Sequence, residues 1–478
     1  MPGLTPGKRW QAAFKPFTKR TFWQNLEGRV ELLIKGPIFG CRMCGNCLLQ
    51  ETAFICPMEC PKGLRNGPCG GATEYCYIDK TRPCIWYHIY RRSFKLGRQE
   101  RLLEVLPPMD WKRAGINLVS EVVHRAWQVG PKRILAGVTK KEGGSRLAVI
   151  ENEVFFPIRQ PEWWRGDSAY HAPVDHEPVS RLEADLKAGK FVVTVEITSP
   201  LSDNTGNLVE EIGLIKPHAT AINFTDSASA TPRMSSEACG KIALEHEAEP
   251  ILQISARDHT RTVLQAKAVG ASALGIHNLF VVTGDSPIIG PDPTARLDIV
   301  DLDSVQMLWI LRRMRDEGIY LGGRKMKYPP KFFLGAAASP MASRPEYQAI
   351  REEKKANAGA QFFQTNVIYD LAALESWMNA IAKRNLLGKV KILVGINILK
   401  SLAMAQYLDR EIPGVFIPKD VMARMEKAGD GADREGFQLA LEMIEGIRKI
   451  KEVNGIHIMP VGREKDVPRL LQEAGLAV

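Results

Sequence analysis

Eight of the nine cysteines lie close together, between Cys41 and Cys84, in the spacing C-x2-C-x2-C-x8-C-x3-C-x8-C-x6-C-x7-C. Thiolates separated by two residues can converge on one inorganic centre, because a tight turn aims their side chains inward. Glycines and prolines from Gly63 to Gly71 favour such turns. We therefore predict that residues 1–140 form a cysteine-rich metal-binding domain. Its candidate ligands are Cys41, Cys44, Cys47, Cys56, Cys60, Cys69, Cys76 and Cys84.

Three roles are open to these cysteines: disulfide bonds, zinc ligation and iron–sulfur ligation. Disulfides are typical of secreted chains, but no apolar signal segment follows the basic N-terminus, so we expect a cytoplasmic protein. Structural zinc sites also use C-x2-C pairs. A third cysteine in C-x2-C-x2-C is not needed for one tetrahedral zinc, however, and this run is typical of [4Fe–4S] ligation in bacterial ferredoxins. We predict iron–sulfur in one or two centres, with zinc as the alternative.

The composition limits the classes of partner. A net charge of +10 would suit a nucleic-acid-binding protein, but no recognised nucleic-acid motif appears. We therefore expect no nucleic acid, and instead an anionic small molecule or an acidic protein. No apolar run approaches the roughly 20 residues of a membrane-spanning helix, so no membrane span is expected.

Two further parts follow the cysteine-rich domain. Residues 141–180 are rich in proline and contain Trp163-Trp164, which predicts a connector that packs on a domain. From Arg181 to the C-terminus, short apolar runs alternate with amphipathic stretches. The eight runs predicted as strands are Phe191–Ile197, Ala219–Phe224, Ile251–Ile254, Leu279–Val282, Phe332–Ala337, Gln361–Ile368, Val390–Ile396 and His457–Pro460.

Helical patterns separate these runs. Asp303-Ser304 would cap a helix that ends near Gly318, and another helix would stop at Asn454-Gly455. Apolar strands separated by helices indicate a parallel sheet. Eight such units in residues 181–478 predict an α/β fold of the (β/α)8 TIM barrel type. A doubly wound open sheet is the alternative, although no G-x-G-x-x-G follows any strand.

In such barrels the chemistry lies at the carboxyl ends of the strands. Glu196 interrupts the first apolar strand, so it either points into the end of the barrel or is buried at considerable cost. Burial there would favour its protonated form, as a general acid requires. Gly284-Asp285 follow the fourth strand, and Lys354-Lys355 precede Ala358-Gly359-Ala360 and the sixth strand.

This order of features, from about Lys190 to the C-terminus, resembles the flavin-dependent methylenetetrahydrofolate reductases. The cysteine block, with Arg65-Asn66-Gly67-Pro68-Cys69-Gly70-Gly71 and Cys84-Ile85-Trp86, is similar to the cysteine-rich partner subunit or domain of this reductase in some anaerobes. That module is described as zinc- or iron–sulfur-binding.

The resemblance implies reduction of 5,10-methylenetetrahydrofolate to 5-methyltetrahydrofolate by a bound FAD or FMN. It makes Glu196 the general acid and Asp285 a second catalytic carboxylate beside flavin and pterin. It assigns Asn366 to the folate, in place of the usual glutamine. It assigns flavin contacts to Thr225, Gln253, Gly284, Asp285, Lys354 and Lys355. The chain departs from the family pattern at Asp226, Thr283 and Ser339.

The cysteine block suggests how electrons arrive. Iron–sulfur centres pass single electrons, and a flavin can collect two and deliver a hydride. We hypothesise that electrons enter through this block from ferredoxin or a partner oxidoreductase. Two alternatives stay open: a folate-dependent methyltransferase barrel that serves a corrinoid protein and needs no flavin, and a non-catalytic metal-bearing scaffold. Oligomers are possible. Cys239 is expected to be a core thiol.

Overall fold

The computed structural model describes residues 13–15, 21–116, 118–140, 148–155, 164, 167–174, 176–257, 259–292, 294 and 300–476. Much of the predicted connector, including Trp163, lies outside these residues. The chain forms two compact units. The first comprises Met1–Arg65 and Pro83–Asp167, and the second comprises Asn66–Arg82 and Ser168–Val478.

The first unit consists of helices joined by irregular loops that carry cysteines. Its α-helices are α1 (Phe22–Phe39), α2 (Ile85–Lys95), α3 (Leu118–Val129) and α4 (Pro131–Lys140). A capping box of Thr21 and Gln24 begins α1, and Gly40, at φ 65°, ends it directly before Cys41. The cysteine loop therefore starts from a fixed helix end.

Buried tryptophans tie the loops of the first unit together. The indole of Trp86, on α2, donates to the carbonyl of Leu64 at 3.2 Å. The indole of Trp164, fully buried, donates to the carbonyl of Val105 at 3.0 Å. Each ring thus packs in the interior while its one N–H group is satisfied.

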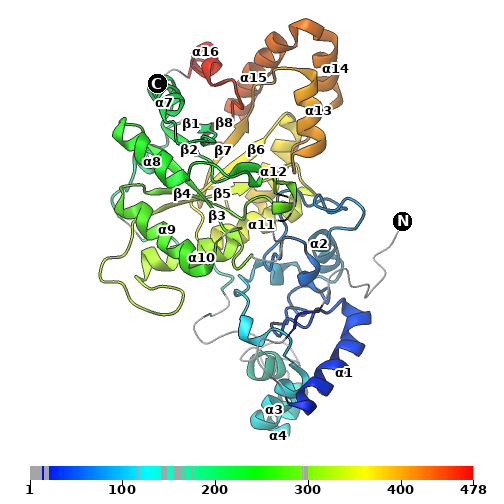
Figure 1. Cartoon of the computed structure of the whole chain (residues 1–478). Coiled ribbons are helices and arrows are strands. Elements are labelled where there is room, and N and C mark those ends of the chain that lie inside the picture. The colour runs from blue at the N-terminus through cyan, green and yellow to red at the C-terminus, as the bar shows by residue number, and fades with distance from the viewer. Residues whose placement is uncertain are drawn as a thin grey trace. The chain divides into compact units, whose positions relative to one another are not determined.

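The second unit is a closed barrel of eight parallel strands in the order β1 to β8 (Figure 1). This confirms the predicted (β/α)8 fold, and each strand begins within a few residues of its predicted position. The strands are β1 (Val192–Ile197), β2 (Ala221–Phe224), β3 (Pro250–Ser255), β4 (Asn278–Val282), β5 (Phe333–Ala338), β6 (Phe362–Val367), β7 (Lys391–Ile396) and β8 (Gly455–Ile458).

Helices surround these strands (Figure 1). They are α6 (Arg181–Lys187), α7 (Gly206–Ile215), α8 (Ser236–Glu245), α9 (Arg261–Ala273), α10 (Ser304–Asp316), α11 (Pro345–Ala358), α12 (Leu371–Lys383), α13 (Leu402–Glu411), α14 (Lys419–Ala428), α15 (Ala432–Lys449) and α16 (Val467–Glu473). As predicted, Asp303 caps α10, in a capping box with Gln306. No helix among the described residues is long and apolar enough to cross a membrane.

The end of α15 differs from the prediction. The helix stops at Lys449, and Gly455 is the first residue of β8. A Cβ atom at Gly455 would lie 2.3 Å from the carbonyl oxygen of Val192 on the neighbouring strand β1. The glycine is therefore required by the close approach of two strands and not by a helix end.

Apolar side chains fill the amino end of the barrel. This cluster contains Leu182, Leu186, Val192, Ala221, Ile251, Phe280, Phe333, Phe362 and Leu393. The rings of Phe333 and Phe362 stack with centroids 4.9 Å apart. Because α6 contributes Leu182 and Leu186 to this cluster, the helix closes the amino end of the barrel.

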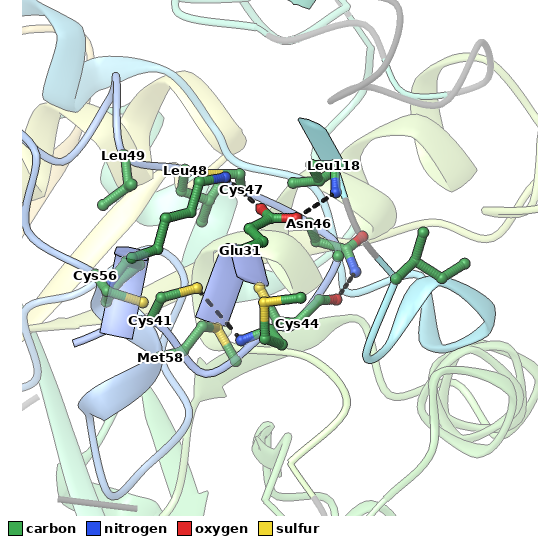
Figure 2. A pocket seen from close by; sticks show the side chains of 15 residues that line it. Glu31, Cys41, Cys44, Asn46, Cys47, Leu48, Leu49, Cys56, Met58 and Leu118 are labelled. Atoms are coloured by element: carbon green, nitrogen blue, oxygen red, sulfur yellow. Dashed lines mark hydrogen bonds and ion pairs between the residues drawn. The ribbon is translucent and has the colours of Figure 1, made fainter. Parts of the chain in front are cut away.

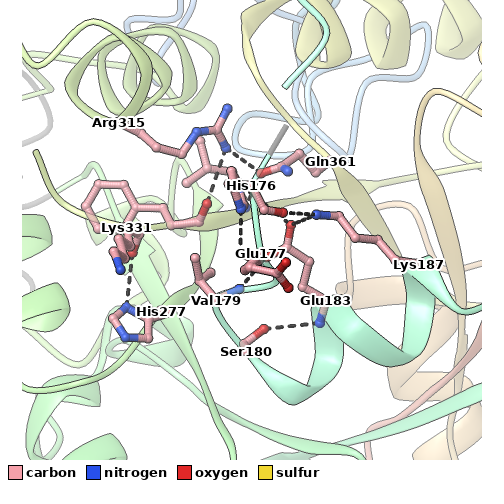
Figure 3. Close-up of polar contacts among 12 residues, drawn as sticks. His176, Glu177, Val179, Ser180, Glu183, Lys187, His277, Arg315, Lys331 and Gln361 are labelled. Carbon is pink, nitrogen blue, oxygen red and sulfur yellow. Dashed lines mark hydrogen bonds and ion pairs between the residues drawn. The ribbon is translucent and has the colours of Figure 1, made fainter. Parts of the chain in front are cut away.

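A buried carboxylate fixes α6 in place (Figure 3). Glu183 is fully buried, accepts a hydrogen bond from the Val179 amide at 2.8 Å and pairs with Lys187 at 3.1 Å. Ser180 caps the helix and also donates to the side chain of Asn278, at the start of β4, at 2.6 Å. Hydrogen bonds and an ion pair thus hold α6 at the amino end of the barrel.

Candidate active site and candidate metal centre

Glu196 projects into the carboxyl end of the barrel. It lies on β1, one residue from the strand end, and its side chain is 19% exposed. Gln253 on β3 donates from Nε2 to Glu196 Oε2 at 2.8 Å. His457 on β8 places Nε2 3.9 Å from the same oxygen. Two of the predicted site residues, Glu196 and Gln253, are therefore in direct contact.

A layer of polar side chains lies directly beneath Glu196. His457 Nδ1 is 3.0 Å from the hydroxyl of Thr194 and 3.3 Å from Nε2 of Gln364. Gln364 and Asn223 exchange two amide hydrogen bonds, at 2.7 and 3.0 Å. All four residues are buried. These contacts hold the His457 ring with its Nε2 atom toward Glu196.

His457 and Gln364 were missed as site residues by sequence reasoning. Gln364 could have been found from its spacing. It lies two positions before Asn366 on the same strand, so both side chains point to the same face of that strand. His457 is likewise the single charged or polar residue of the four-residue strand β8.

Gly284 and Asp285 follow β4 at this end of the barrel. Gly284 has φ 87°, and a Cβ atom there would lie 2.1 Å from the hydroxyl of Ser255. A side chain is thus excluded both by backbone conformation and by space. Asp285 accepts a hydrogen bond from the backbone amide of Ser229 at 2.8 Å, and Arg257 donates to its carbonyl at 3.1 Å.

Two positions singled out in the sequence lie at the end of β2: a predicted flavin contact, Thr225, and a departure from the family pattern, Asp226. Thr225 is buried, and its hydroxyl accepts from the backbone amide of Ser199 at 3.1 Å. Asp226, at a departure from the family pattern, accepts from the amide of Ser255 at 2.9 Å and pairs with Lys267 at 3.4 Å. Its charge is therefore compensated within the barrel wall.

Lys354 and Lys355 are buried on α11. The ammonium of Lys355 donates to the carbonyl of Ala337, which lies at the carboxyl end of β5. Burial, and then the nearby Arg351, lower the pKa of Lys355 to about 7, while Glu352 opposes the shift. The second lysine of the pair thus sits at the end of the barrel where Glu196 lies.

Asn366 lies on β6, and its amide donates to the carbonyl of Gly414. Its Oδ1 atom is buried and has no hydrogen-bond partner among the described residues. The segment Asn66–Arg82 packs beside it, because a Cβ atom at Gly414 would lie 2.4 Å from the carbonyl oxygen of Gly70. A Cβ atom at Gly70 would itself lie 2.8 Å from the hydroxyl of Ser339.

The segment Asn66–Arg82 is anchored at its start. The backbone amide and side chain of Asn66 donate to Asp303 Oδ2 at 2.8 and 3.1 Å. Asp303 also caps α10, so one buried carboxylate fixes both a barrel helix and this segment. Cys69 and Cys76 therefore belong to the same compact unit as the barrel.

Four of the predicted metal ligands line one pocket of the first unit (Figure 2). They are Cys41, Cys44, Cys47 and Cys56. The remaining lining is largely apolar, with Leu48, Leu49 and Met58, but α1 also contributes the ion pair of Glu31 and Lys35. Among the described residues, no three histidine, cysteine or acidic side chains are arranged to hold a single metal ion directly.

Burial dominates the electrostatics of this pocket. It raises the pKa of the Cys41 thiol to about 12, and Cys44 and Cys47 add to the effect by repulsion. Burial likewise raises the pKa values of Cys47 and Cys56. Four thiolates would therefore repel one another here unless a cationic centre compensated their charge.

The other cysteines lie elsewhere. Cys60 is buried in the first unit, and Cys84 precedes α2 as its N-cap residue. His88, on α2, is buried. Cys239 is fully buried on α8.

Comparisons with known proteins show the family of the chain. A family model described as methylenetetrahydrofolate reductase matches residues 181–475. The chain belongs to the methylenetetrahydrofolate reductase family. A second model, described as the C-terminal part of methylene-tetrahydrofolate reductase, matches residues 25–112, which span most of the cysteine-rich domain. No curated protein matched the chain.

Several solved structures are similar to this reductase-family chain. An uncharacterized protein from Clostridium thermocellum that binds two copies of 5-methyl-5,6,7,8-tetrahydrofolic acid is 16% identical, with a TM-score of 0.46, covering 62% of this chain and 98% of that one. A riboflavin lyase with modified FMN and riboflavin is 11% identical, with a TM-score of 0.38 and coverages of 60% and 93%. An F420-dependent secondary alcohol dehydrogenase is 11% identical, with a TM-score of 0.40 and coverages of 60% and 99%.

Proposed function

We propose that the protein reduces 5,10-methylenetetrahydrofolate to 5-methyltetrahydrofolate with a bound flavin, and that electrons enter through metal centres of the cysteine-rich domain. One observation carries the proposal. In a barrel of the methylenetetrahydrofolate reductase family, a carboxyl group inside the carboxyl end contacts an amide donor and faces a buried histidine: Glu196, Gln253 and His457.

The residues at this end of the barrel fit a flavin. The buried polar atoms there that lack hydrogen-bond partners among the described residues include Ser255 Oγ and Asn366 Oδ1. Gly284 has no side chain, so a ligand can approach its backbone beside Ser255. The buried Lys354 and Lys355 would supply positive charge for a flavin phosphate. Following the resemblance, the residues that hold the flavin are Thr225, Gln253, Gly284, Asp285, Lys354 and Lys355. A bound flavin supplies the hydride chemistry; FMN and FAD both suit these contacts.

The side chains of the chain itself carry the proton chemistry. Glu196 holds the proton that moves to N5 of the folate, and the Gln253 amide fixes which of its oxygens faces the substrate. Asp285 is held in position by the Ser229 amide, so its negative charge stabilises the cationic form of the opened folate ring. Asn366 contributes the free Oδ1 atom to the pterin.

The four cysteines that line the pocket of the first unit are the candidate ligands of one centre. Cys41, Cys44, Cys47 and Cys56 would form the ligand set, and their C-x2-C-x2-C run favours a [4Fe–4S] cluster over zinc. Cys60, Cys69, Cys76 and Cys84 stay candidates for a second centre. An iron–sulfur cluster would supply one-electron transfer, which suits ferredoxin or a partner oxidoreductase as donor.

The test begins with anaerobically purified protein, its visible spectrum and its iron, zinc and acid-labile sulfide content. Flavin bands together with iron and sulfide are expected. A colourless protein that takes up no FMN or FAD would contradict the proposal and favour the flavin-free methyltransferase. Zinc without sulfide would remove the electron route but leave the barrel chemistry intact.

The Glu196→Gln variant tests the general acid. It keeps a hydrogen-bonding side chain beside Gln253 but cannot donate an acidic proton. We expect formation of 5-methyltetrahydrofolate with dithionite as reductant to fall roughly 10²- to 10⁴-fold, while reduction of the flavin itself persists. Val263→Gln, on the exposed face of α9, is the control. Unchanged folate turnover in Glu196→Gln would remove this assignment.

A further inference from the structure

The first unit presents an apolar helix face to solvent. On α1, the side chains of Phe22, Trp23, Leu26, Val30, Leu33, Ile34 and Ile38 are exposed, Leu33 to 74%. Their spacing of three to four residues places them on one broad side of the helix. Exposed apolar patches of this extent mark interaction sites in soluble proteins. We call this set the α1 apolar face.

The opposite side of the same helix reaches the four-cysteine pocket. Glu31, which is buried, and Lys35 line that pocket together with Cys41 and Cys44 (Figure 2). Only the thickness of one helix therefore separates the α1 apolar face from the proposed metal ligands. A protein bound on this face would be near the centre that we assign to electron entry.

Charge is distributed very unevenly along the chain. Residues 1–140 contain 23 Lys and Arg against 10 Asp and Glu, a net charge of +13. The remaining residues contain 41 against 44, a net charge of −3, so the whole excess of +10 comes from the cysteine-rich domain. The positive potential is thus concentrated on the part of the chain that carries the apolar helix.

The exposed side chains show the same bias. In the described part of the first unit, eight exposed residues are cationic and two are acidic, Glu27 and Glu100. The cationic ones are Lys15, Arg29, Arg91, Arg92, Lys95, Lys112, Lys132 and Arg133. A partner for this surface should therefore be acidic and should carry an apolar patch.

We propose that the α1 apolar face, on the strongly basic cysteine-rich domain, forms the docking surface for an acidic protein that carries a one-electron redox centre. The proposal rests on the function proposed above and names the surface where electrons enter. Two one-electron transfers are needed for each folate reduced, because a hydride is equivalent to two electrons and one proton.

Two other occupants fit less well. In a dimer formed through α1, two cysteine-rich domains would come together, and residues 1–140 of each copy carry a net charge of +13, so the two domains would repel each other. Membrane-surface helices carry many lysines and arginines on their polar side, whereas α1 has only Arg29 and Lys35, and Lys35 is paired with Glu31 inside the pocket.

The test compares two double variants of the full-length protein. Leu26→Glu/Val30→Glu changes side chains that are 42% and 48% exposed on α1. Leu274→Glu/Val263→Glu changes the same residue types, 43% and 46% exposed, at α9 of the barrel. Equal exposure and equal added charge make the second variant a matched control. Unfolding temperatures of both should stay close to that of the parent.

The probe is a small acidic two-cluster ferredoxin, with basic cytochrome c as the probe of opposite charge. We expect ferredoxin to bind the parent at about 20 mM salt and to weaken roughly tenfold or more at about 300 mM, because salt screens exposed charges. Leu26→Glu/Val30→Glu should lose at least roughly tenfold in affinity at low salt, and the control should stay within about twofold. Cytochrome c should not bind.

Three results would overturn the proposal. The first is that ferredoxin binds the parent and Leu26→Glu/Val30→Glu with equal affinity. The second is that the parent is a dimer and this variant a monomer. The third is that phosphatidylserine vesicles capture the parent but not the variant. Dithionite-driven folate reduction separates the two claims. Its absence in a parent that still binds ferredoxin through α1 would defeat the proposed function and leave the docking surface standing.

Discussion

At the scale of residues, the candidate site depends on contacts between strands that are far apart in sequence. Glu196, Asp285 and Gly284 could be predicted, because each breaks an apolar pattern at a strand end. His457 and Gln364 could not, because their role arises only when β8 closes against β1 and places Nε2 3.9 Å from Glu196. No local pattern encodes which strands become neighbours on closure.

His457→Gln tests the contact between β8 and β1. The variant loses the imidazole that faces Glu196, so the carboxyl group is less well positioned. We expect kcat for folate reduction to fall roughly ten- to a hundredfold with a smaller change in KM.

The same substitution at His277, at the amino end of β4, is the control for His457. His277 contacts the carbonyl of Lys331 and lies far from Glu196 along its strand. It should leave kcat and KM unchanged. A His457→Gln enzyme with the parent's kcat would show that His457 does not position Glu196.

Lys355 predicts a pH dependence of flavin binding. Its pKa is lowered to about 7, so the side chain is cationic below this pH and neutral above it. Affinity for the phosphate of FMN should therefore fall as pH rises through 7, and Lys355→Met should remove that fall. Fluorescence titration with FMN from pH 6 to 8.5 measures this affinity. Lys241 is an exposed lysine on α8 that pairs with Glu245, and the control variant Lys241→Met should behave as the parent.

At the scale of elements, local chemistry decided which bounds could be predicted. The start of α10 follows from the capping box of Asp303 and Gln306, which four residues of sequence contain. The end of α15 does not, because Gly455 is explained by the backbone of β1 and not by its own neighbours. The barrel itself was predictable, since eight apolar runs separated by helices allow few other folds.

The amino end of the barrel shows the same division. The apolar cluster around Phe333 and Phe362 follows from continuous apolar strands. The buried Glu183, which anchors α6 through Val179 and Lys187, gives no sequence signal that separates it from a surface glutamate. A buried polar group is therefore difficult to recognise from a single sequence, because the sequence around it does not show that it is buried or which groups it contacts.

At the scale of the whole molecule, the two compact units should respond differently to loss of the metal centre proposed for the first unit. Ligands held in loops lose their organising centre when it is removed, whereas the barrel has its own core. After oxidative removal of iron and sulfide, we expect hydrogen exchange of residues 41–60 to become much faster and that of β1–β8 to stay the same. Unchanged exchange in residues 41–60 would contradict a structural role for the centre.

Asp303 makes the barrel inseparable from part of the cysteine-rich sequence. It caps α10 and holds Asn66, and the glycines that follow Asn66 lie against Ser339 and Gly414. A shortened protein starting at Arg181 would leave this carboxylate buried with donors missing and would uncover the wall beside Asn366. The boundary along the chain and the boundary in space therefore do not coincide, and a shortened barrel made from this chain should keep residues 66–82.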